Sequence, residues 1–584
     1  MDVINKLYEK GRQMEKSKSI SDRKGRGIFY TPIEVVDYMS MNIIRNVNLI
    51  ENPYVRILDI SCGAGYFLLK AFELIKTMFE QHLEDILNIH TELKGILSVD
   101  TIGKFVAENN IWGVDIDTDA VSFVKAALQE ASGLGSSCSA NIICADSLLS
   151  WVYDGELSWF WKQGFDIVIG NPPYIGHKAV PREYKEKLYK YYKDVYRDKA
   201  DISYCFFKRG INLLKQEGIL CFITSRYFIE GPSAMGLREF LNGYSIDEIV
   251  DFGDSKIFND AGVSVCIISI RKGEGSKLVK VKKMPDKLGV KSDDLLIKGL
   301  EEFNISKDFL KNDGWVLLEP EKLEVFQLID KLSTHSLDQI FDSCQGIITG
   351  CDRAFILSQE QAEELKIEKT LLRPWIKNSQ VEKFFIKPSD KLIIYTNLIK
   401  QPEKYPVALG FAESYKDRLT QRRECQKGFR EWYELQWGRD SKNFDSPKII
   451  YPYKAAENRF AVDRNSLYCS ADVYSLLLKD KYLEEFSLEY FAALLNSKLV
   501  EFYFKCYAKK INTALYDYYP NTVLRIKLKL DIISSEIIDL VKSLKNYQNT
   551  AENKCILQAI DREVYKMYSL TEKQIKTIEN SAGE

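Results

Sequence analysis

The sequence predicts an α/β fold, in which a mostly parallel sheet with helices on both faces is followed by a domain of mixed α and β structure. Short apolar runs alternate with helical stretches between residues 53 and 270, which is the pattern of a parallel sheet. Polar residues follow one apolar run after another, where each expected strand ends. Parallel sheets bind ligands outside the carboxyl ends of their strands, so a ligand site is expected at that edge.

The expected strands of this sheet are short apolar runs bounded by turn or polar residues. They lie at residues 55–60, 111–114, 141–144, 165–169, 219–224 and 263–270. The first is followed by a glycine-containing turn, and the next three end in Asp115, Asp146 and Asn171. A buried sheet alone does not require polar residues at these positions, so they are the first candidates for a ligand site.

The bulk composition indicates a globular protein of two or three domains. The chain has 584 residues, of which 45% are hydrophobic and 28% charged. No apolar run reaches 18 residues, and the N-terminal residues are polar, so neither a membrane span nor a secretion signal is expected. Twelve cysteines without a CxxC pair and only four histidines predict reduced thiols in a cytoplasm, without a metal site.

Charge is concentrated locally, although the net charge is only -2. Residues 178–209 hold ten Lys or Arg against five Asp or Glu, and residues 416–464 hold twelve against eight. Both stretches are also rich in aromatic residues. Such stretches suit phosphate contacts, but two solvated helices explain the charge equally well.

Three regions are expected along the chain. Residues 1–294 form the first domain, and their last part, residues 272–294, is rich in Lys, Gly and Asp and is interpreted as a linker or a ragged edge of the sheet. Residues 311–528 form the second domain, and residues 529–584 form helices that end the chain.

The turn after the first strand predicts a nucleoside site. It carries Asp59, Ser61 and Gly63, and its glycines let the backbone approach a ligand closely. Asp115, next to Ile116, can accept hydrogen bonds from ribose hydroxyls, and Asp146 with Ser147 can accept from an adenine amino group. Each aspartate taken alone is also a good helix N-cap.

A helix start lies upstream of the sheet, at Tyr30-Thr31-Pro32. Thr31 suits the N-cap, and Pro32 suits the first helical position. The free backbone N–H groups of such a start can also hold a carboxylate, so these three residues are candidates for ligand binding.

The fourth strand ends in Asn171-Pro172-Pro173-Tyr174. Two consecutive prolines make a stiff loop that fixes the Asn171 side chain and the Pro172 carbonyl in one place. Two acceptors that hold both hydrogens of an adenine N6 would favour attack of its lone pair on a methyl donor. Tyr174 can stack on the ring. The alternative is an ordinary turn after a strand.

Taken in order, these motifs resemble the gamma-class, TaqI-like N6-adenine DNA methyltransferases. The resemblance implies a Rossmann-like class I methyltransferase domain with a mixed α/β C-terminal target-recognition domain. It implies S-adenosyl-L-methionine as the cofactor. The Asn171 loop would hold the target adenine, and a later aromatic, Phe258, would pack on the flipped base. Phe258 as an ordinary core residue remains the alternative.

A narrower resemblance covers nearly the whole chain. Residues 345–352, 432–439 and 516–521 are similar to the recognition domain of CamA-type orphan adenine methyltransferases of clostridia, which are associated with sporulation. This resemblance implies methylation of the last adenine of CAAAAA. Only about 26 residues precede Gly27, too few for a nuclease core, so modification without cutting is expected.

The expected partner is double-stranded DNA, with no obligate protein partner, because a target base must leave the duplex to reach the methyl group. The protein would then lie in the bacterial nucleoid. The candidate DNA-binding residues are basic and lie in or beside the two basic stretches: Lys178, Arg422, Arg423, Arg439, Lys454 and Arg459.

Two other functions remain open at this point. The first is a methyltransferase of the same fold that acts on RNA or on protein glutamine, since the Asn171 loop also suits an amide or another exocyclic amine. A DNA-binding specificity protein without enzymatic activity is the second alternative. The long second domain disfavours the first alternative, and the intact Asp59–Phe67 turn with Asn171 disfavours the second.

Overall fold

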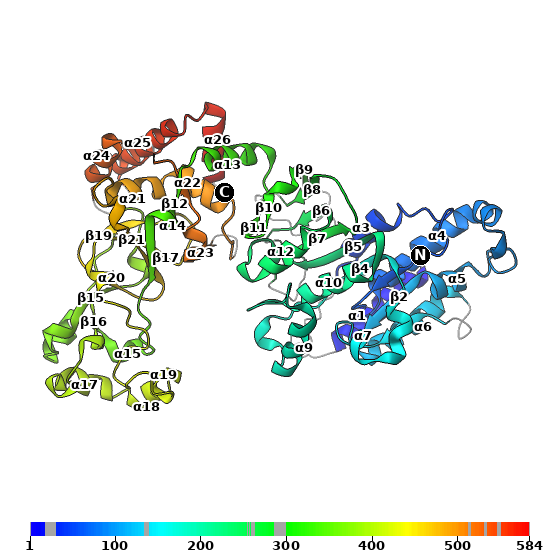
Figure 1. Ribbon diagram of the computed structural model, residues 1–584, viewed down its shortest axis with the longest axis horizontal. Helices are drawn as coiled ribbons and strands as arrows, with labels where there is room; N and C mark the ends of the chain where they lie inside the picture. The colour runs from blue at the N-terminus through cyan, green and yellow to red at the C-terminus, as the bar shows by residue number, and fades with distance from the viewer. Residues whose placement is uncertain are drawn as a thin grey trace. The chain divides into compact units, whose positions relative to one another are not determined.

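The computed structural model describes residues 2–17, 31–133, 139–253, 255, 257, 263–284, 299–511, 515–530, 534–545 and 550–582. The chain forms two compact units, Met1–Pro320 and Glu321–Glu584, each described here by itself (Figure 1). Within the described residues, no helix is both long and apolar enough to cross a membrane.

Nine of the described strands of the first unit form one sheet, in the order β3-β2-β1-β4-β5-β7-β6-β8-β9. Pairing is parallel from β3 to β5 and antiparallel on both sides of β7. The strands are β1 (Ile57–Asp59), β2 (Ile111–Asp115), β3 (Asn141–Cys144), β4 (Phe165–Gly170), β5 (Leu214–Ser225), β6 (Ser245–Asp251), β7 (Val265–Arg271), β8 (Leu278–Lys283) and β9 (Glu301–Ser306). The predicted Rossmann-like α/β fold is confirmed.

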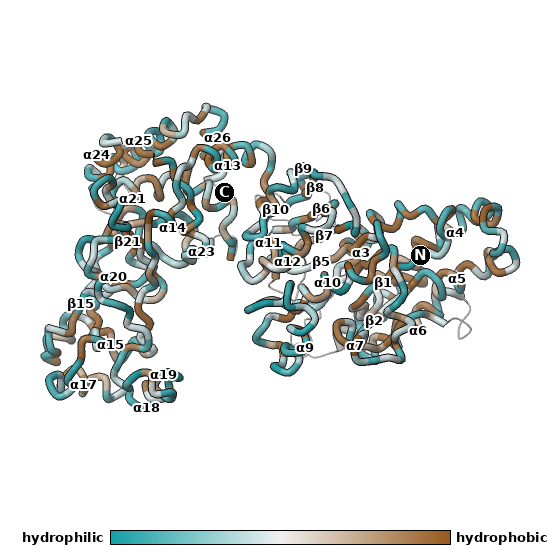
Figure 2. Tube along the Cα trace, in the orientation of Figure 1, coloured by the Kyte–Doolittle hydropathy of each residue, from teal (hydrophilic) through white to brown (hydrophobic). Residues whose placement is uncertain are grey.

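Helices pack on this sheet through apolar faces (Figures 1 and 2). In α4, Leu68, Leu69 and Ile75 are fully buried, and burying one such side chain contributes about 1.5–3 kcal/mol. The main helices are α1 (Asp2–Ser17), α3 (Ile33–Ile44), α4 (Tyr66–Ile89), α5 (Ile102–Asn109), α6 (Thr118–Ser132), α9 (Arg182–Tyr192), α10 (Ser203–Leu213) and α12 (Met235–Leu241).

The sheet extends into the segment that the sequence predicts as a linker, residues 272–294. Strand β8 lies there and pairs with both β6 and β9. Its Val279 and Val281 are buried, while Lys280 and Lys282 form ion pairs with Glu302 of β9 at 3.4 and 3.6 Å. The linker interpretation is wrong for residues 278–283, because an alternating strand can form with only two buried apolar residues and lysines at most of the other positions.

The described part of the second unit combines helices with two four-stranded sheets and two two-stranded sheets. Among its described strands, one sheet has the order β13-β21-β17-β19 and another has the order β14-β16-β15-β20. The first comprises β13 (Phe341–Gln345), β21 (Val473–Leu478), β17 (Lys448–Pro452) and β19 (Ala461–Asp463). The second comprises β14 (Ile356–Ser358), β16 (Lys391–Ile394), β15 (Leu372–Ile376) and β20 (Tyr468–Cys469).

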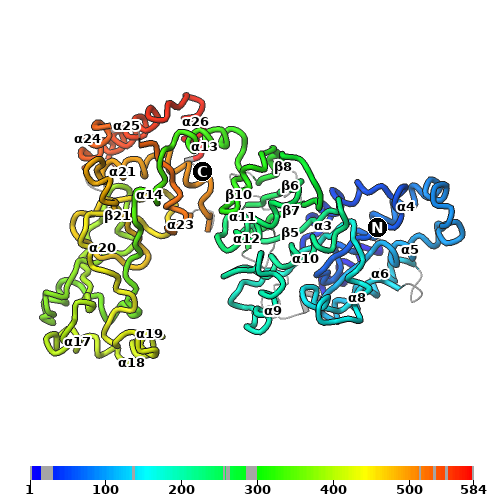
Figure 3. Tube along the Cα trace, in the orientation of Figure 1, coloured from blue at the N-terminus to red at the C-terminus, as the bar shows by residue number. Residues whose placement is uncertain are grey.

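Helices lie at both ends of the second unit (Figure 3). One end carries α17 (Pro406–Glu413), α18 (Lys416–Thr420) and α19 (Arg423–Gln426), and the other carries α24 (Ser535–Ser543), α25 (Ala551–Met567) and α26 (Glu572–Ala582). Helix α24 contacts α21 (Leu488–Asn496), and α26 contacts α22 (Lys498–Lys505). The expected C-terminal helices are therefore present within this unit, while the boundary at residue 528 stays a prediction.

Candidate active site

The register of the parallel strands brings the predicted site residues to one edge of the sheet. Asp59 pairs with Gly113 of β2, two residues before Asp115. Strand β4 lies on the other side of β1 and ends at Gly170, directly before Asn171. The turn after β1, the end of β2 and the Asn171 loop are therefore neighbours.

Asp59 is the last residue of β1 and is buried, with 1% of its surface exposed. Its Oδ1 accepts a hydrogen bond from the Ser61 backbone N–H at 2.9 Å. Burial, and secondarily the nearby Asp115 carboxylate, raise the pKa of Asp59 to about 8. A Cβ at Gly170 would lie 2.6 Å from the same oxygen, so this position accepts only glycine. Asp59 is thus a buried acid beneath the loop that it helps to shape.

Asp115 connects β2 to the turn after β1. Its Oδ2 accepts from the Gly63 N–H at 2.8 Å, and its Oδ1 accepts from the Asp117 N–H at 2.9 Å. These two bonds fix the orientation of the Asp115 carboxylate at the edge of the sheet. Ile116 beside it is 68% exposed, which leaves an apolar side chain at the edge. Asp117, rather than Asp115, is the N-cap of α6.

Gly65 ends the turn and starts α4. Its φ is +80°, and a Cβ there would lie 2.8 Å from Val124 Cγ2. A side chain is therefore excluded by both backbone conformation and space. The glycine allows α4 to begin with only the six residues 60–65 between it and the end of β1, at the edge of the sheet where the sequence predicts a ligand site.

Asp146 is engaged by a tyrosine from α9. The Tyr184 hydroxyl lies 3.1 and 3.0 Å from the two carboxylate oxygens, and Oδ1 also accepts from the Leu148 N–H at 2.9 Å. Burial, followed by the charge of Asp146, raises the pKa of Tyr184, which therefore remains a donor. Ser147 Oγ donates to the Ile60 carbonyl at 2.6 Å. The pairing of Tyr184 with Asp146 has no local sequence signal, because 38 residues separate them.

The Asn171 amide is held at both ends. Its Nδ2 donates to Thr31 Oγ1 at 3.0 Å, and its Oδ1 accepts from the Tyr174 hydroxyl at 2.5 Å. The same hydroxyl lies 3.2 Å from the Ile223 carbonyl of β5. Burial raises the pKa of Tyr174 well above its ordinary value, so its hydroxyl keeps its proton. Pro172 is buried, and the Asn171 carbonyl lies 3.5 Å from Ser61 Oγ.

The structure corrects the expected helix start at Thr31. Helix α3 begins at Ile33, and Pro32 is the N-cap residue, without a side-chain cap. Thr31 is 4% exposed, and its hydroxyl contacts Asn171 instead. The N-cap interpretation of Thr31 and the placement of Pro32 at the first helical position are therefore wrong, because a partner 140 residues away takes the hydroxyl.

Two candidate residues, Tyr30 and Phe258, lie outside the described residues. Their predicted roles stay predictions.

The candidate DNA-binding residues differ in what their side chains do. Arg422 is buried and donates to the carbonyls of Leu419, Thr349 and Trp432 at 2.9, 3.1 and 2.9 Å. Its guanidinium supports the fold, so the expectation that Arg422 meets a phosphate is wrong. Arg423 and Lys178 are exposed, whereas Lys454 and Arg459 are half-buried. The Lys454 ammonium lies 4.9 Å from the centre of the Tyr453 ring.

The three recognition-like segments converge in the second unit. Ile348 and Trp437 form an antiparallel bridge, and Arg439 donates to the Gln345 side chain at 2.7 Å. Gln345 pairs in turn with Tyr474, whose ring lies 6.0 Å from that of Tyr519. Residues from all three segments therefore meet around Gln345 and Tyr474, in a surface of amide, guanidinium and aromatic groups.

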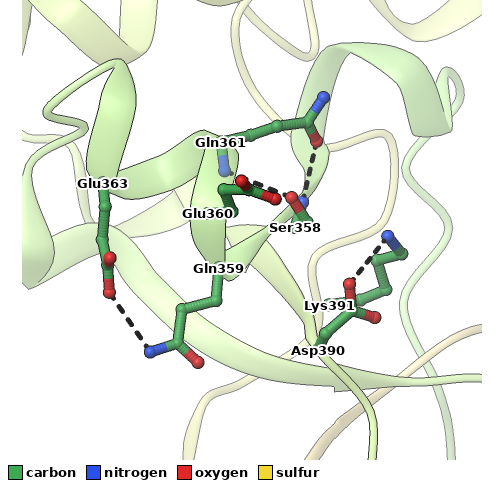
Figure 4. A pocket seen from close by; sticks show the side chains of 7 residues that line it. All are labelled: Ser358, Gln359, Glu360, Gln361, Glu363, Asp390 and Lys391. Atoms are coloured by element: carbon green, nitrogen blue, oxygen red, sulfur yellow. Dashed lines mark hydrogen bonds and ion pairs between the residues drawn. The ribbon is translucent and has the colours of Figure 1, made fainter.

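A hollow of about 680 Å³ lies elsewhere on the second unit (Figure 4). Its polar side chains bond to one another: Gln359 donates to Glu363 at 3.2 Å, and Lys391 donates to Asp390 at 3.2 Å. Ser358 and Gln361 form the capping box of α16 (Gln359–Glu364). These side chains account for the helix start rather than for a catalytic group.

The two units match two protein families. Residues 109–258 match the family of the Eco57I restriction-modification methylase, and residues 365–526 match the TaqI-like C-terminal specificity domain. The chain is an adenine-specific DNA methyltransferase, and its two units are similar to the Eco57I and TaqI-like families. The first match includes Asp115, Asp146 and the Asn171 loop, and the second includes the whole basic stretch at residues 416–464.

Curated relatives of this methyltransferase are similar over most of their length. Type II methyltransferase M.HindII of Haemophilus influenzae is 26% identical over 84% of this chain and 86% of its own. Type II methyltransferase M.BanIII of Aneurinibacillus aneurinilyticus is 24% identical over 79% and 82%. The restriction enzyme and methyltransferase RM.Eco57I of Escherichia coli is 23% identical, and this chain spans 55% of its length.

A solved structure shares the fold of the methyltransferase. The type IIL restriction-modification enzyme MmeI, solved in complex with DNA, superposes with a TM-score of 0.62 at 13% identity. The match covers 95% of this chain and 78% of MmeI. At this sequence identity the similarity shows a shared fold and nothing further.

Proposed function

We propose that this methyltransferase transfers a methyl group from S-adenosyl-L-methionine to N6 of an adenine flipped out of duplex DNA. The observation that carries the proposal is the fixed Asn171 amide, which Thr31 and Tyr174 hold beside the Asp59–Phe67 turn. An acceptor fixed next to a cofactor loop is what N6 requires, because a fixed dipole need not reorganise during the reaction.

The donor set at the sheet edge supports S-adenosyl-L-methionine as the cofactor. Asp115 would hold the ribose hydroxyls, Asp146 the adenine amino group, and the exposed Ile116 one face of the adenine. Asp59, Ser61 and Gly63 shape the turn that would receive the methionine end. The cofactor supplies an electrophilic methyl group on a positively charged sulfur.

The chain's own residues would orient the target nitrogen. Asn171 Oδ1 and the Pro172 carbonyl would accept the two N6 hydrogens and leave the nitrogen lone pair facing the methyl group. Thr31 binds the amide Nδ2, which keeps Oδ1 on the opposite side, toward Tyr174. The Tyr174 ring would stack on the flipped base, and Phe258 would pack on it as well. N6 would then compete with the Tyr174 hydroxyl for Oδ1.

The second unit would select the site. Arg423, Lys454, Arg459 and, from the first unit, Lys178 would contact phosphates. The Arg439–Gln345 pair presents guanidinium and amide groups, which suit base edges in the major groove. We keep CAAAAA as the proposed sequence, and with it an orphan role in sporulation, on the resemblance of residues 345–352, 432–439 and 516–521 to the CamA-type enzymes.

We also propose that the chain modifies DNA without cutting it. Support comes from relatives named as methyltransferases, M.HindII and M.BanIII, for which it spans 86% and 82% of their length. For RM.Eco57I, named as a restriction enzyme and methyltransferase, it spans 55%. Incubation of plasmid DNA with Mg²⁺ and the protein would test this directly, since any cleavage contradicts it.

One experiment tests the proposed reaction. Labelled S-adenosyl-L-methionine is offered with duplex DNA, structured RNA and a protein mixture, and modified adenine is then mapped by sequencing. Label in duplex DNA at one adenine of CAAAAA supports the proposal. Label in RNA or protein supports the alternative substrates, and cofactor binding without transfer supports a specificity protein.

A further inference from the structure

Phe429 projects from the second unit with 74% of its side chain exposed. It follows α19, in the segment before α20 (Lys442–Asp445), at the end of the unit that carries α17, α18 and α19 (Figure 3). An aromatic ring left in water forgoes the stabilisation that burial would give. An exposed apolar side chain of this size is typical of a site that binds a partner.

Hydrogen bonds fix the backbone around Phe429. Gly428 has a φ of +70°, and its N–H donates to the Cys425 carbonyl at 3.0 Å. The Phe429 N–H donates to the Glu424 carbonyl at 2.9 Å, which reverses the chain after α19. These bonds form a helix-ending turn that requires glycine in the left-handed conformation. The Phe429 side chain therefore extends from a backbone turn of defined conformation.

Buried Arg422 fixes this turn to the rest of the unit. Its donors bind Thr349 in the loop after β13, Leu419 at the end of α18, and Trp432 beyond the turn. Glu424 within α19 also accepts from the Gln436 side chain at 3.0 Å. The turn is thus held from both of its sides. Because the backbone at Phe429 is already fixed, less conformational freedom is lost when this residue binds a partner.

Basic residues lie before and after Phe429 in the chain. Arg423 and Lys427 are exposed, and Arg430 follows Phe429 directly. Figure 2 shows the chain along α18 and α19 as mostly hydrophilic. A partner that suits both the Phe429 ring and these basic residues must offer flat apolar surface together with negative charge. Phosphates and stacked bases of a DNA duplex provide both.

We propose that Phe429 is a wedge that inserts between base pairs of the bound duplex, while Arg423 and Lys427 hold the phosphates beside it. This inference rests on the proposed function, since it assumes a duplex DNA substrate. Unstacking a base step costs free energy, which a rigid apolar side chain in the gap offsets. The wedge lowers the cost of distorting the duplex so that the target base can leave it.

The test compares Phe429→Ala with Phe429→Trp, and uses Leu398→Ala as the matched control at another exposed apolar position of the unit. Activity is measured on a matched duplex and on the same duplex with a mismatch beside the target adenine. A 2-aminopurine in the matched duplex reports unstacking by its fluorescence. The melting temperature and cofactor binding of each variant are checked first.

We expect Phe429→Ala to lower kcat/KM on the matched duplex about 10- to 100-fold, the value of one base–aromatic stack. Phe429→Trp and Leu398→Ala should stay near wild type. The mismatch should restore most of the lost activity, and the 2-aminopurine signal should fall for Phe429→Ala only. Wild-type activity of Phe429→Ala on the matched duplex, or an equal loss on both duplexes, would overturn the wedge. If the wild-type protein methylates no DNA, the proposed function fails instead.

Discussion

Thr31 accepts a hydrogen bond from the Asn171 side chain at 3.0 Å, although 140 residues separate them. Thr31 precedes α3, and Asn171 follows β4, so the contact joins the start of the unit to the proposed N6 site. Because Thr31 binds the Nδ2 end, it sets which end of the amide remains for the target base. We regard Thr31 as a positioning residue for Asn171.

Replacing Thr31 should therefore impair transfer more than binding. Thr31→Val keeps the shape but removes the acceptor, and one neutral hydrogen bond contributes about 1 kcal/mol, so kcat should fall roughly 5- to 10-fold. Thr31→Ser keeps the hydroxyl and should restore most of kcat. Cofactor affinity measured by calorimetry should change little in both. A Thr31→Ser variant as impaired as Thr31→Val would argue that only packing matters.

The raised pKa of Asp59 predicts a pH dependence of stability. Its folded pKa of about 8 lies above the ordinary value of 3.8, so the folded state holds this proton more tightly than the unfolded state. Stability contributed by the protonated acid is complete below pH 3.8 and is lost progressively as the pH rises toward 8. The slope approaches about 1.4 kcal/mol per pH unit within this window.

Asp59→Asn isolates this effect, because an amide cannot titrate but can still accept from the Ser61 N–H. We expect the free energy of unfolding of Asp59→Asn to increase relative to wild type between pH 5 and pH 8, as measured by urea denaturation. A constant difference across this range would mean that Asp59 is ionised in the folded protein at pH 5.

Arg422 and Arg423 are neighbours at the start of α19, and substituting each of them gives a controlled comparison. Arg423 is exposed, so Arg423→Ala should weaken DNA binding and lower the log–log salt slope by about one. Arg422 is buried with three backbone acceptors, so Arg422→Ala should instead lower the melting temperature. DNA titrations at several salt concentrations and thermal unfolding distinguish the two. Equal salt slopes for wild type and Arg423→Ala would remove Arg423 from the DNA contact.

A buried ion pair holds two strands of the second unit together. Lys448 of β17 and Asp463 of β19 are ion-paired, and both side chains are 0% exposed. Lys448→Met would leave a buried carboxylate without its cation and should cost about 3–5 kcal/mol of stability. Lys545→Ala breaks an exposed pair with Glu552 and should cost less than about 1 kcal/mol. Similar losses in urea denaturation for both variants would contradict this difference.

Local patterns in the sequence were sufficient for the sheet and for the residues at its edge. Asp115 and Asn171 follow apolar runs of strand length, so their position was predictable from the run that precedes each. Strand β8 was missed because its two buried valines alternate with lysines, and composition there resembles a linker.

Contacts between distant segments could not be read from the sequence. Tyr184 binds Asp146, and Arg422 binds three carbonyls, but neither residue differs in type from its exposed neighbours such as Tyr189 and Arg423. Only the folded chain decides which basic or aromatic residue turns inward. The phosphate assignment failed at Arg422 for this reason, while the exposed Arg423 next to it remains a candidate.

The proposed division between Asn171 and the aspartates is the central claim, and one measurement tests it most directly. Asn171→Ala is compared with wild type for methyl transfer to duplex DNA and, by calorimetry, for binding of S-adenosyl-L-methionine. We expect transfer to fall to background while the cofactor affinity remains within about threefold, because Asp115 and Asp146 are untouched. Near-normal turnover by Asn171→Ala would show that this amide does not hold N6 and would contradict the account.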